Sequence, residues 1–318
     1  MLLKKTDWLR PFLLSAALTA EEARRMPIGG QAVIEGVLMK GKDLWGLAVR
    51  RPDGTIFRES WNNSSRVGRY PWKLPLLRGV VVMCEMMATG FRALSRSAEI
   101  ALEETQEKLT ARDILIAVFM AVFAVAGLFV ALPLWLADWA ERALSLSPLG
   151  ANVFEGLVRA AIFIGYIGLI GLWSDIRQVF RYHGAEHKTI NAFEACMDMN
   201  PPNIARCSRI HPRCGTSFLL ITVIVSIAVF SAIGEGGFLW RAGTRVLLIP
   251  LVIGLSYEII RLTSNAGTAG RLIMAPVLSL QYLTTREPNL AQIEVALTSL
   301  NAALGRDRDP APSAASPS

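Results

Sequence analysis

The stretch ILIAVFMAVFAVAGLFVALPLWLA occupies residues 114–137 and holds 24 consecutive residues without a charge. An α-helix needs about 20 largely apolar residues to cross the hydrocarbon core of a bilayer. The stretch therefore predicts a transmembrane helix. The whole chain is 52% hydrophobic and only 19% charged, which suits a protein whose solvent is the bilayer. We expect a mainly α-helical, polytopic membrane protein.

Three further apolar runs follow this stretch. Residues 160–174 are uncharged over 15 positions and residues 217–234 over 18, and a shorter run covers residues 246–257. The second and fourth runs reach spanning length only if neighbouring residues are added to them. Together the runs predict about four spans, within a transmembrane core at residues 111–265.

The charges between the runs predict the orientation. Residues 138–156 contain one basic residue, whereas residues 175–216 contain six. Loops rich in Lys and Arg stay in the cytoplasm. We therefore expect a multi-pass protein of the cytoplasmic (inner) membrane, with both termini and the 175–216 loop in the cytoplasm.

The N-terminal segment, residues 1–26, is basic and contains a short apolar stretch, so a signal peptide has to be considered. Arg10-Pro11 interrupts that stretch, and Thr19 and Glu22 have the spacing of a capping box, which suits the start of a helix. Cleavage would also place the most basic third of the chain outside, against the positive-inside rule. We therefore expect this segment to be retained.

Two regions lie between this segment and the spans. Residues 27–73 predict a small, partly β cytoplasmic region, because two short strand patterns flank the turn Pro52-Asp53-Gly54. Residues 74–110 predict an interfacial or re-entrant helix, because the uncharged run at 79–84 is too short to span.

The C-terminal region, residues 266–304, predicts a packing helix after Pro288. Its apolar residues fall on one helical face: Leu290, Ile293, Leu297, Leu300 and Leu304. Residues 305–318 have the composition of a disordered tail.

The three histidines of the chain lie within 29 positions of one another. The sequence YHGAEHKTI, residues 182–190, contains the pattern HxxEH as His183, Glu186 and His187. Positions i and i+4 share one face of a helix, so both imidazoles can reach one metal ion. Glu186 lies beside them and is our candidate general base, by analogy with HxxEH metallopeptidases. We expect a divalent metal, with zinc as the best candidate.

A third ligand is expected from HPRCGTSF, where His211 and Cys214 are three residues apart. Antiparallel spans return the chain to the same membrane face, which places both motifs at one interface. Catalytic zinc sites have three protein ligands and one open position, whereas structural sites are closed by four. The sequence is compatible with a catalytic site and with a structural site. A structural site could combine Cys207, His211 and Cys214 with His183 or His187.

Two other charged residues are candidates. Glu194 lies seven residues after His187 on the same helical face and could orient a ligand imidazole. Glu258 follows the fourth run, with Arg261 three residues later. Ionisable residues at a membrane boundary are functional candidates. A solvated charge and an interfacial ion pair are the structural alternatives.

Five segments occur in an order that resembles the YqhQ family of bacterial membrane proteins of unknown function, from about residue 27 to about residue 300. They are GGQAVIEGVLMKG, YHGAEHKTINAFE, HPRCGTSF, SYEIIR and LQYLTTREP. That family is described as predicted metal-dependent enzymes. The resemblance implies functional roles for His183, Glu186, His187, Lys188, Glu194, His211, Arg213, Cys214 and Gly215.

Cys196 and Cys207 lie outside this family pattern. Their absence from it favours His211 or Cys214 as the third ligand. A four-ligand structural site made by His183, His187, His211 and Cys214 is a further alternative.

We therefore expect a zinc-dependent hydrolase that acts on a membrane-embedded or membrane-adjacent peptide or lipid at the cytoplasmic face. The rival hypothesis is a non-enzymatic scaffold or assembly factor with a structural metal site. A transporter using Glu258 and Arg261 is disfavoured by the lack of an internal repeat. Despite the net charge of +7, we do not expect nucleic-acid binding, because no basic recognition helix or aromatic platform is visible. The sequence does not determine the oligomeric state.

Overall fold

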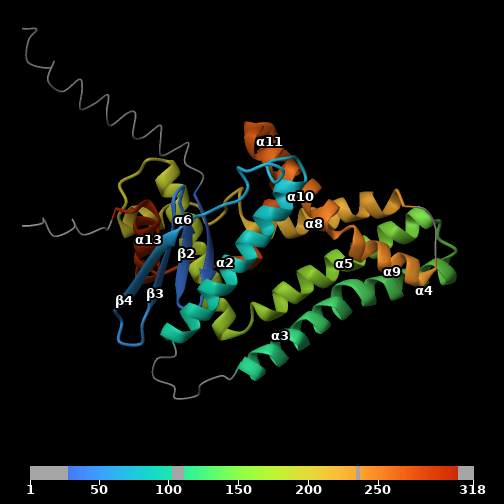
Figure 1. The fold of residues 1–318 in the computed structure, drawn as a ribbon, viewed down its shortest axis with the longest axis horizontal. Coiled ribbons are helices and arrows are strands. Elements are labelled where there is room, and N and C mark those ends of the chain that lie inside the picture. Colours follow the sequence, from blue (N-terminus) through green and yellow to red (C-terminus); the bar gives the residue numbers. More distant parts are fainter. Residues whose placement is uncertain (1–27, 102–110, 234–236, 307–318) are drawn as a thin grey trace, which may run out of the picture.

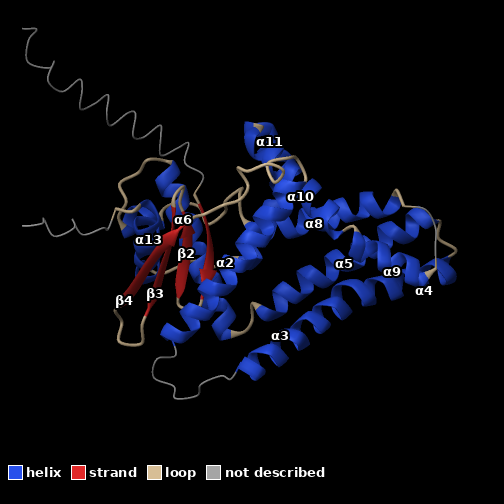
Figure 2. Ribbon diagram, in the orientation of Figure 1, coloured by secondary structure: helices blue, strands red, loops and turns tan. Residues whose placement is uncertain are grey.

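The computed structural model describes residues 28–101, 111–233 and 237–306, and the described part is mainly helical with one small sheet (Figures 1 and 2). The N-terminal segment, with the capping box expected at Thr19 and Glu22, and all but the start of the C-terminal tail lie outside these residues. The strands are β1 (Gly29–Val33), β2 (Gly36–Lys40), β3 (Leu44–Arg50) and β4 (Ile56–Asn62).

The helices follow the sheet in the chain. They are α2 (Leu77–Ala101), α3 (Ala111–Ala126), the π-helix η1 (Gly127–Ala131), α4 (Leu132–Leu144), α5 (Pro148–Ile170), α6 (Ser174–Glu194), α7 (Pro201–Ala205), α8 (Gly215–Ser231), α9 (Phe238–Leu247), α10 (Ile249–Asn265), α11 (Gly267–Ser279), α12 (Gln281–Thr284) and α13 (Leu290–Leu304).

The sheet is an antiparallel meander in the order β1-β2-β3-β4. The turn predicted at Pro52-Asp53-Gly54 is confirmed, because β3 and β4 pair up to Arg50 and Ile56 around it. Gly54 has a φ of +86°, which a glycine adopts without strain. The sequence GGQAVIEGVLMKG forms a second hairpin that joins β1 to β2.

Both faces of the sheet are buried, because successive residues of a strand point to opposite sides. Val37, Met39 and Ala48 point to one face and pack with residues of α6 and α13. Leu38 and Leu47 point to the other face and pack with residues of α2. Three helices therefore enclose the sheet, and the C-terminal packing helix expected after Pro288 is confirmed as α13.

The segment expected as an interfacial or re-entrant helix, residues 74–110, is described as α2 up to residue 101. Ala93 and Ile100 of α2 are buried against the sheet. Its first turn lies on α10, where Gly79 is in close contact with Tyr257. The sheet has a second apolar face that must be covered, and α2 covers it.

Gly46 of β3 makes a close backbone contact with α13. A Cβ atom there would lie 2.4 Å from the Ala303 nitrogen and 2.4 Å from the Ser299 oxygen. Because these are backbone atoms, they cannot move aside cheaply, and overpacking of this kind costs about 1–3 kcal/mol. We expect Gly46→Ala to lower the free energy of unfolding by this amount, measured by chemical unfolding in detergent micelles.

The matched control for Gly46→Ala is Gly29→Ala. Gly29 is also a strand glycine, and a Cβ atom there would meet nothing within 4 Å. We expect this control to unfold like the natural chain. Equal stability of both variants would mean that α13 does not pack on β3 as described.

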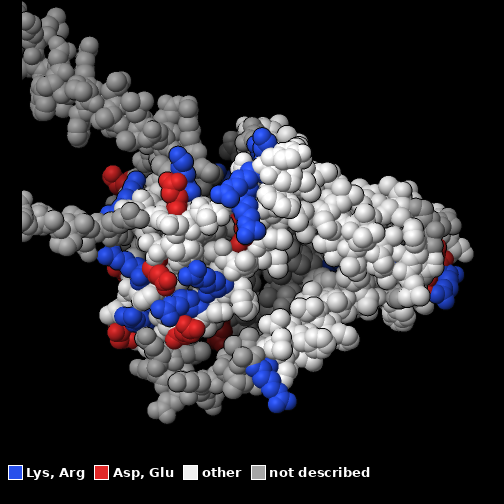
Figure 3. All heavy atoms as spheres, viewed as in Figure 1, with Lys and Arg blue, Asp and Glu red and all other residues white. Residues whose placement is uncertain are grey.

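Two described helices are long and apolar enough to cross a bilayer: Leu115–Leu144, which runs through α3, η1 and α4, and Pro148–Ile170. The bent pair α9 and α10 makes a third if it counts as one span. Figure 3 shows an uncharged surface over these helices, with charged residues at the sheet end and at the opposite tip. The described residues therefore include two or three helices that could span a membrane, which is consistent with a membrane protein.

Two of the expected spans differ from the prediction for identifiable reasons. The expected third span is α8, a 17-residue helix that is apolar but short. The expected fourth span is bent by 48° between α9 and α10. Pro250 lies in the first turn of α10, and its missing N–H removes the hydrogen bond that would continue the helix through Leu248.

Charged residues lie inside this helical region and pair with one another. Glu155 of α5 is 1% exposed and accepts hydrogen bonds from Arg159 at 2.6 Å and from Arg245 of α9 at 2.7 Å. Arg159 also donates to the Phe129 carbonyl of η1 at 3.0 Å. Glu155 and Arg159 lie just before the uncharged run at residues 160–174 and shorten it. Within the fold their charges are neutralised by ion pairs.

Candidate functional site

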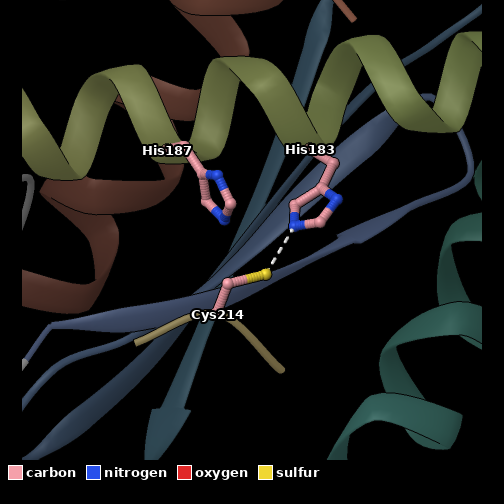
Figure 4. A group of neighbouring side chains, drawn as sticks. All are labelled: His183, His187 and Cys214. Atoms are coloured by element: carbon pink, nitrogen blue, oxygen red, sulfur yellow. Dashed lines mark hydrogen bonds between the residues drawn. The ribbon is translucent and has the colours of Figure 1, made fainter. Parts of the chain in front are cut away.

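Helix α6 positions the two imidazoles of the HxxEH pattern. His183 and His187 project from the same face of α6 toward Cys214 (Figure 4), and their ring centroids are 4.4 Å apart. The opposite face of α6 packs on the sheet through Tyr182 and Ala185. Burial of that apolar face fixes the rotation of the helix, and with it the direction of both imidazoles.

Cys214 brings the second motif to this face. It precedes the first residue of α8 and is 8% exposed. Its Sγ lies 3.2 Å from His183 Nε2. One ligand atom each from His183, His187 and Cys214 lies within 4.8 Å of the other two. Among the described residues these three side chains form the group that could hold a metal ion.

Backbone carbonyls orient both imidazoles. His183 Nδ1 lies 2.9 Å from the Thr284 carbonyl oxygen, and His187 Nδ1 lies 2.6 Å from that of Arg209. A carbonyl oxygen only accepts, so each Nδ1 carries the hydrogen, and each Nε2 faces the cysteine. Carbonyl partners of this kind fix the tautomer and direction of metal-binding histidines.

The electrostatics of the site favour a thiolate. Desolvation alone would raise the pKa of Cys214, but the neighbouring His183 outweighs it and holds the pKa well below its ordinary value. Desolvation likewise would lower the pKa of His183, yet Cys214 raises it to about 9. The site therefore favours the thiolate, which is the form of cysteine that binds metals.

His187 differs from His183. Burial and the charge of His183 lower the pKa of His187, which keeps its ring neutral. Its Nε2 is buried and has no hydrogen-bond partner in the described part of the chain. A neutral imidazole nitrogen that is buried and unpaired costs free energy, and a metal ion would satisfy it.

Glu186 lies next to these rings on α6 and faces strand β1. It is 4% exposed, and burial raises its pKa to about 8. Its Oε1 would lie 2.8 Å from a Cβ atom at Gly30, so glycine in β1 leaves the room that the carboxylate occupies. Its Oε2 has no hydrogen-bond partner among the described residues.

His211 lies beside the ligand group but not in it. Its ring centroid is 5.8 Å from that of His187. Its backbone N–H and carbonyl are both hydrogen-bonded to the Gln281 side chain at 2.8 Å. Its Nε2 lies 3.5 Å from Glu194 Oε1, and burial lowers its pKa to about 4. Of the two candidates for third ligand, Cys214 is therefore the one whose ligand atom meets both imidazoles.

The other candidate residues occupy supporting positions. Glu194 accepts a hydrogen bond from Arg213 as well as facing His211, so it joins α6 to the second motif. Lys188 is 5% exposed and donates to the carbonyls of Ala205 and Cys207, each at 2.8 Å. Lys188 thereby holds the loop that leads to the second motif.

Glu258 and the remaining cysteines lie outside the ligand group. Glu258 accepts hydrogen bonds from Arg78 Nε of α2 at 2.6 Å and from the Leu76 N–H at 3.4 Å, whereas the spacing suggested Arg261 as its partner. The group does not include Cys84, Cys196 or Cys207.

Sequence reasoning missed four residues that shape the site. Thr284, Arg209 and Gln281 act through backbone or amide contacts, and Gly30 acts through the space that it leaves. Two signals were present. Gln281 and Thr284 lie in LQYLTTREP and Gly30 lies in GGQAVIEGVLMKG, both segments of the family pattern.

Comparisons with known proteins agree with that pattern. Residues 74–306 match a family model described as Protein of unknown function (DUF1385). The chain is 34% identical over 290 residues to the Bacillus subtilis (strain 168) protein described as Uncharacterized protein YqhQ, and the match covers 86% of this chain and 91% of that one. No solved structure matches the chain. The similarity to YqhQ confirms the resemblance seen in the sequence. The chain therefore belongs to the DUF1385 family.

Proposed function

We propose that this protein is a zinc-dependent membrane hydrolase whose site faces the cytoplasm. One observation carries the proposal: the ligand atoms of His183, His187 and Cys214 lie within 4.8 Å of one another, beside an unpaired carboxylate oxygen of Glu186. Three protein ligands with an adjacent acid are the arrangement of catalytic zinc sites, which keep a fourth position for water.

The donor set suits zinc. A thiolate with two imidazole nitrogens is a ligand combination that zinc takes in enzymes, and carboxylate-rich calcium and magnesium sites differ from it. The unpaired His187 Nε2 and the low pKa of Cys214 support the same assignment. When bound, zinc supplies the Lewis acidity that makes water easier to deprotonate.

The protein side chains would divide the remaining work. Glu186 takes the proton of the attacking water and returns it to the leaving group. Glu194 and Arg213 hold the second motif against α6, and the Thr284 and Arg209 carbonyls keep the imidazoles aligned. Burial of the cluster excludes bulk water, which strengthens the electrostatic effects within it.

The proposal includes a topology of four spans: α3 to α4, α5, α8, and α9 to α10. The contact of α5 with α8 and of α8 with α10 supports a common bundle. In this topology the 175–216 segment joins the second span, α5, to the third span, α8, so both of its ends lie at the same face of the membrane. Its six basic residues support a cytoplasmic location for that face and for both termini. The substrate would be a membrane-embedded or membrane-adjacent peptide or lipid.

Glu186→Gln tests the catalytic role. We expect the variant to bind one zinc ion per chain, like the natural protein, and to hydrolyse substrate about 100- to 10,000-fold more slowly, because loss of a general base has this effect. Zinc is measured by elemental analysis. Hydrolysis is measured in liposomes with two probes, a fluorogenic apolar decapeptide and a fluorogenic phospholipid, which separate the two substrate classes.

Glu99→Gln is the control for this experiment, because Glu99 is an exposed carboxylate on α2. Loss of zinc from Glu186→Gln would make Glu186 a ligand and end its assignment as base. Absence of hydrolysis of both probes by the zinc-loaded natural protein would end the hydrolase assignment.

Burial of the site favours one other candidate function, a structural zinc site in a membrane scaffold. His187 is 1% exposed and Cys214 is 8% exposed. The nearby His211 would be the fourth ligand of such a closed site. His211→Ala distinguishes the two, because a structural site would lose zinc with this variant, whereas the three-ligand site would retain it.

A further inference from the structure

The strand next to the candidate site lies at the edge of the sheet. β1 pairs with β2 alone, and no other described strand pairs with its second edge. In Figure 2 the strands β4, β3 and β2 run from left to right, so the β1 edge faces the helical bundle. An edge strand presents unpaired backbone groups that another extended chain can bind.

The register determines which groups of β1 are unpaired. β1 and β2 are joined by two residues, with Val33 opposite Gly36, and such a hairpin closes on a hydrogen-bonded pair. Bonded and non-bonded pairs then alternate, so Gln31 bonds to β2 and Gly30 and Ala32 do not. The N–H and carbonyl of Gly30 and Ala32 therefore point to the free edge.

The neighbouring pairing agrees with this register. The Arg50 N–H donates to the Glu35 carbonyl at 2.8 Å, and the Gly41 N–H donates to the Leu44 carbonyl at 2.8 Å. The odd-numbered residues from Glu35 to Gly41 thus bond toward β3. The even-numbered residues of β2 are left to bond β1, as the hairpin requires.

The unpaired groups lie beside the proposed catalytic residues. The Glu186 carboxylate lies against Gly30, because a Cβ atom at Gly30 would be 2.8 Å from its Oε1. Glu186 and the two histidines belong to the same two turns of α6. A chain that paired with Gly30 and Ala32 would therefore run close to the Glu186 carboxylate, which lies on the helix that carries His183 and His187.

We propose that the substrate is a peptide, which binds in an extended conformation by adding a strand to the free edge of β1. This inference rests on the proposed hydrolase function and names its substrate class. Backbone amides spaced along a strand match the outward groups of Gly30 and Ala32, whereas an acyl chain offers no such groups. The alternative substrate, a lipid, is an outcome of the test.

The reaction balances with water as the only co-reactant. The water oxygen bonds to the scissile carbonyl carbon while Glu186 takes a proton from that water. The C–N bond then breaks, and the proton on Glu186 goes to the departing amine. The products are a peptide carboxylate and a peptide amine.

Peptide hydroxamates test the pairing in the full-length, zinc-loaded protein in detergent micelles. The probe is an alternating valine–alanine tetrapeptide with a C-terminal hydroxamate, and each amide in turn is N-methylated. We expect N-methylation to weaken binding about tenfold at every second amide, where a hydrogen bond to β1 is lost, and less than about twofold at the amides between. Acetohydroxamate is the reference without a peptide backbone.

Hydrogen exchange locates the probe without any substitution in the protein. We expect the tetrapeptide to slow exchange of the Gly30 and Ala32 amides, while acetohydroxamate does not. Ser60 is the control, because its N–H points to the free edge of β4 on the far side of the sheet and should exchange at an unchanged rate.

The outcomes separate this inference from the function on which it rests. Binding of acetohydroxamate and the tetrapeptide with equal affinity would retain the zinc site and overturn strand addition. Hydrolysis of the fluorogenic phospholipid with no hydrolysis of the decapeptide would retain the hydrolase and overturn the peptide assignment. A natural protein that binds no zinc would overturn the proposed function itself.

Discussion

Replacement of Cys214 by alanine is expected to lower the zinc affinity of the protein at least about 100-fold, because one of three ligands is lost. The reason lies in the geometry of the group. His183 Nε2 faces the Cys214 sulfur at 3.2 Å, and both imidazoles converge on that atom. Removal of the thiolate leaves two ligands on one helix, which do not enclose an ion. Elemental analysis of purified protein measures the loss.

Cys207→Ala is the matched control for Cys214→Ala. Cys207 lies in the same connecting segment but outside the ligand group. Its Sγ contacts the Met197 sulfur at 3.5 Å, and we expect this variant to retain one zinc ion per chain. Zinc retained by Cys214→Ala and lost from Cys207→Ala would reverse our choice of the third ligand.

Replacement of Glu155 by glutamine is expected to destabilise the helical bundle by about 3–5 kcal/mol, the usual cost of removing one partner from a buried ion pair. Glu155 accepts hydrogen bonds from two arginines, and Arg245 is only 5% exposed. The amide removes the negative charge and leaves the guanidinium groups of the buried Arg245 and the partly buried Arg159 without a carboxylate partner. Chemical unfolding in detergent micelles measures the change.

Glu141→Gln provides the comparison for this variant. Glu141 pairs with Arg241 at 2.8 Å, but its side chain is 34% exposed. Exposed pairs contribute about 0–1 kcal/mol, so we expect little change in stability. If Glu155→Gln proved as stable as the natural chain, the arginines would have to be neutralised by other groups.

The local features of the site could be predicted from the sequence. The spacing of His183 and His187 predicts two imidazoles on one helical face, and the structure brings their rings to 4.4 Å. The flanking apolar runs predict that HPRCGTSF lies at the same membrane face as the histidines. In the structure, Cys214 of this motif contacts His183. Periodicity carries this information because both inferences depend on residues within one helix or on chain direction.

Contacts between distant segments could not be predicted in this way. The carbonyls of Thr284 and Arg209 orient the histidines, and a carbonyl leaves no mark in a sequence because every residue has one. The choice between His211 and Cys214 depended on the turn before α8, which periodicity does not describe.

The same limit applied to the charges of the helical region. Glu155 lies in the segment 138–156 between the first two apolar runs, and its partner Arg245 lies 90 residues away in the sequence. The bounds of the helices have related causes. Pro250 lies at the bend between α9 and α10, and the buried ion pairs of Glu155 let α5 continue through charged positions. Hydropathy alone registers neither effect.

The break at Leu248 has a mechanical consequence. On one side of it, α9 is clamped to α5 through Arg245 and Glu155. On the other side, α10 is clamped to α2 through Glu258 and Arg78, and α2 lies on the sheet. Leu248 thus lies at the bend between two helices, each of which is held by an ion pair to a different part of the fold. A change in the angle between α9 and α10 would therefore have to break one of these ion pairs or shift α5 or α2 with it.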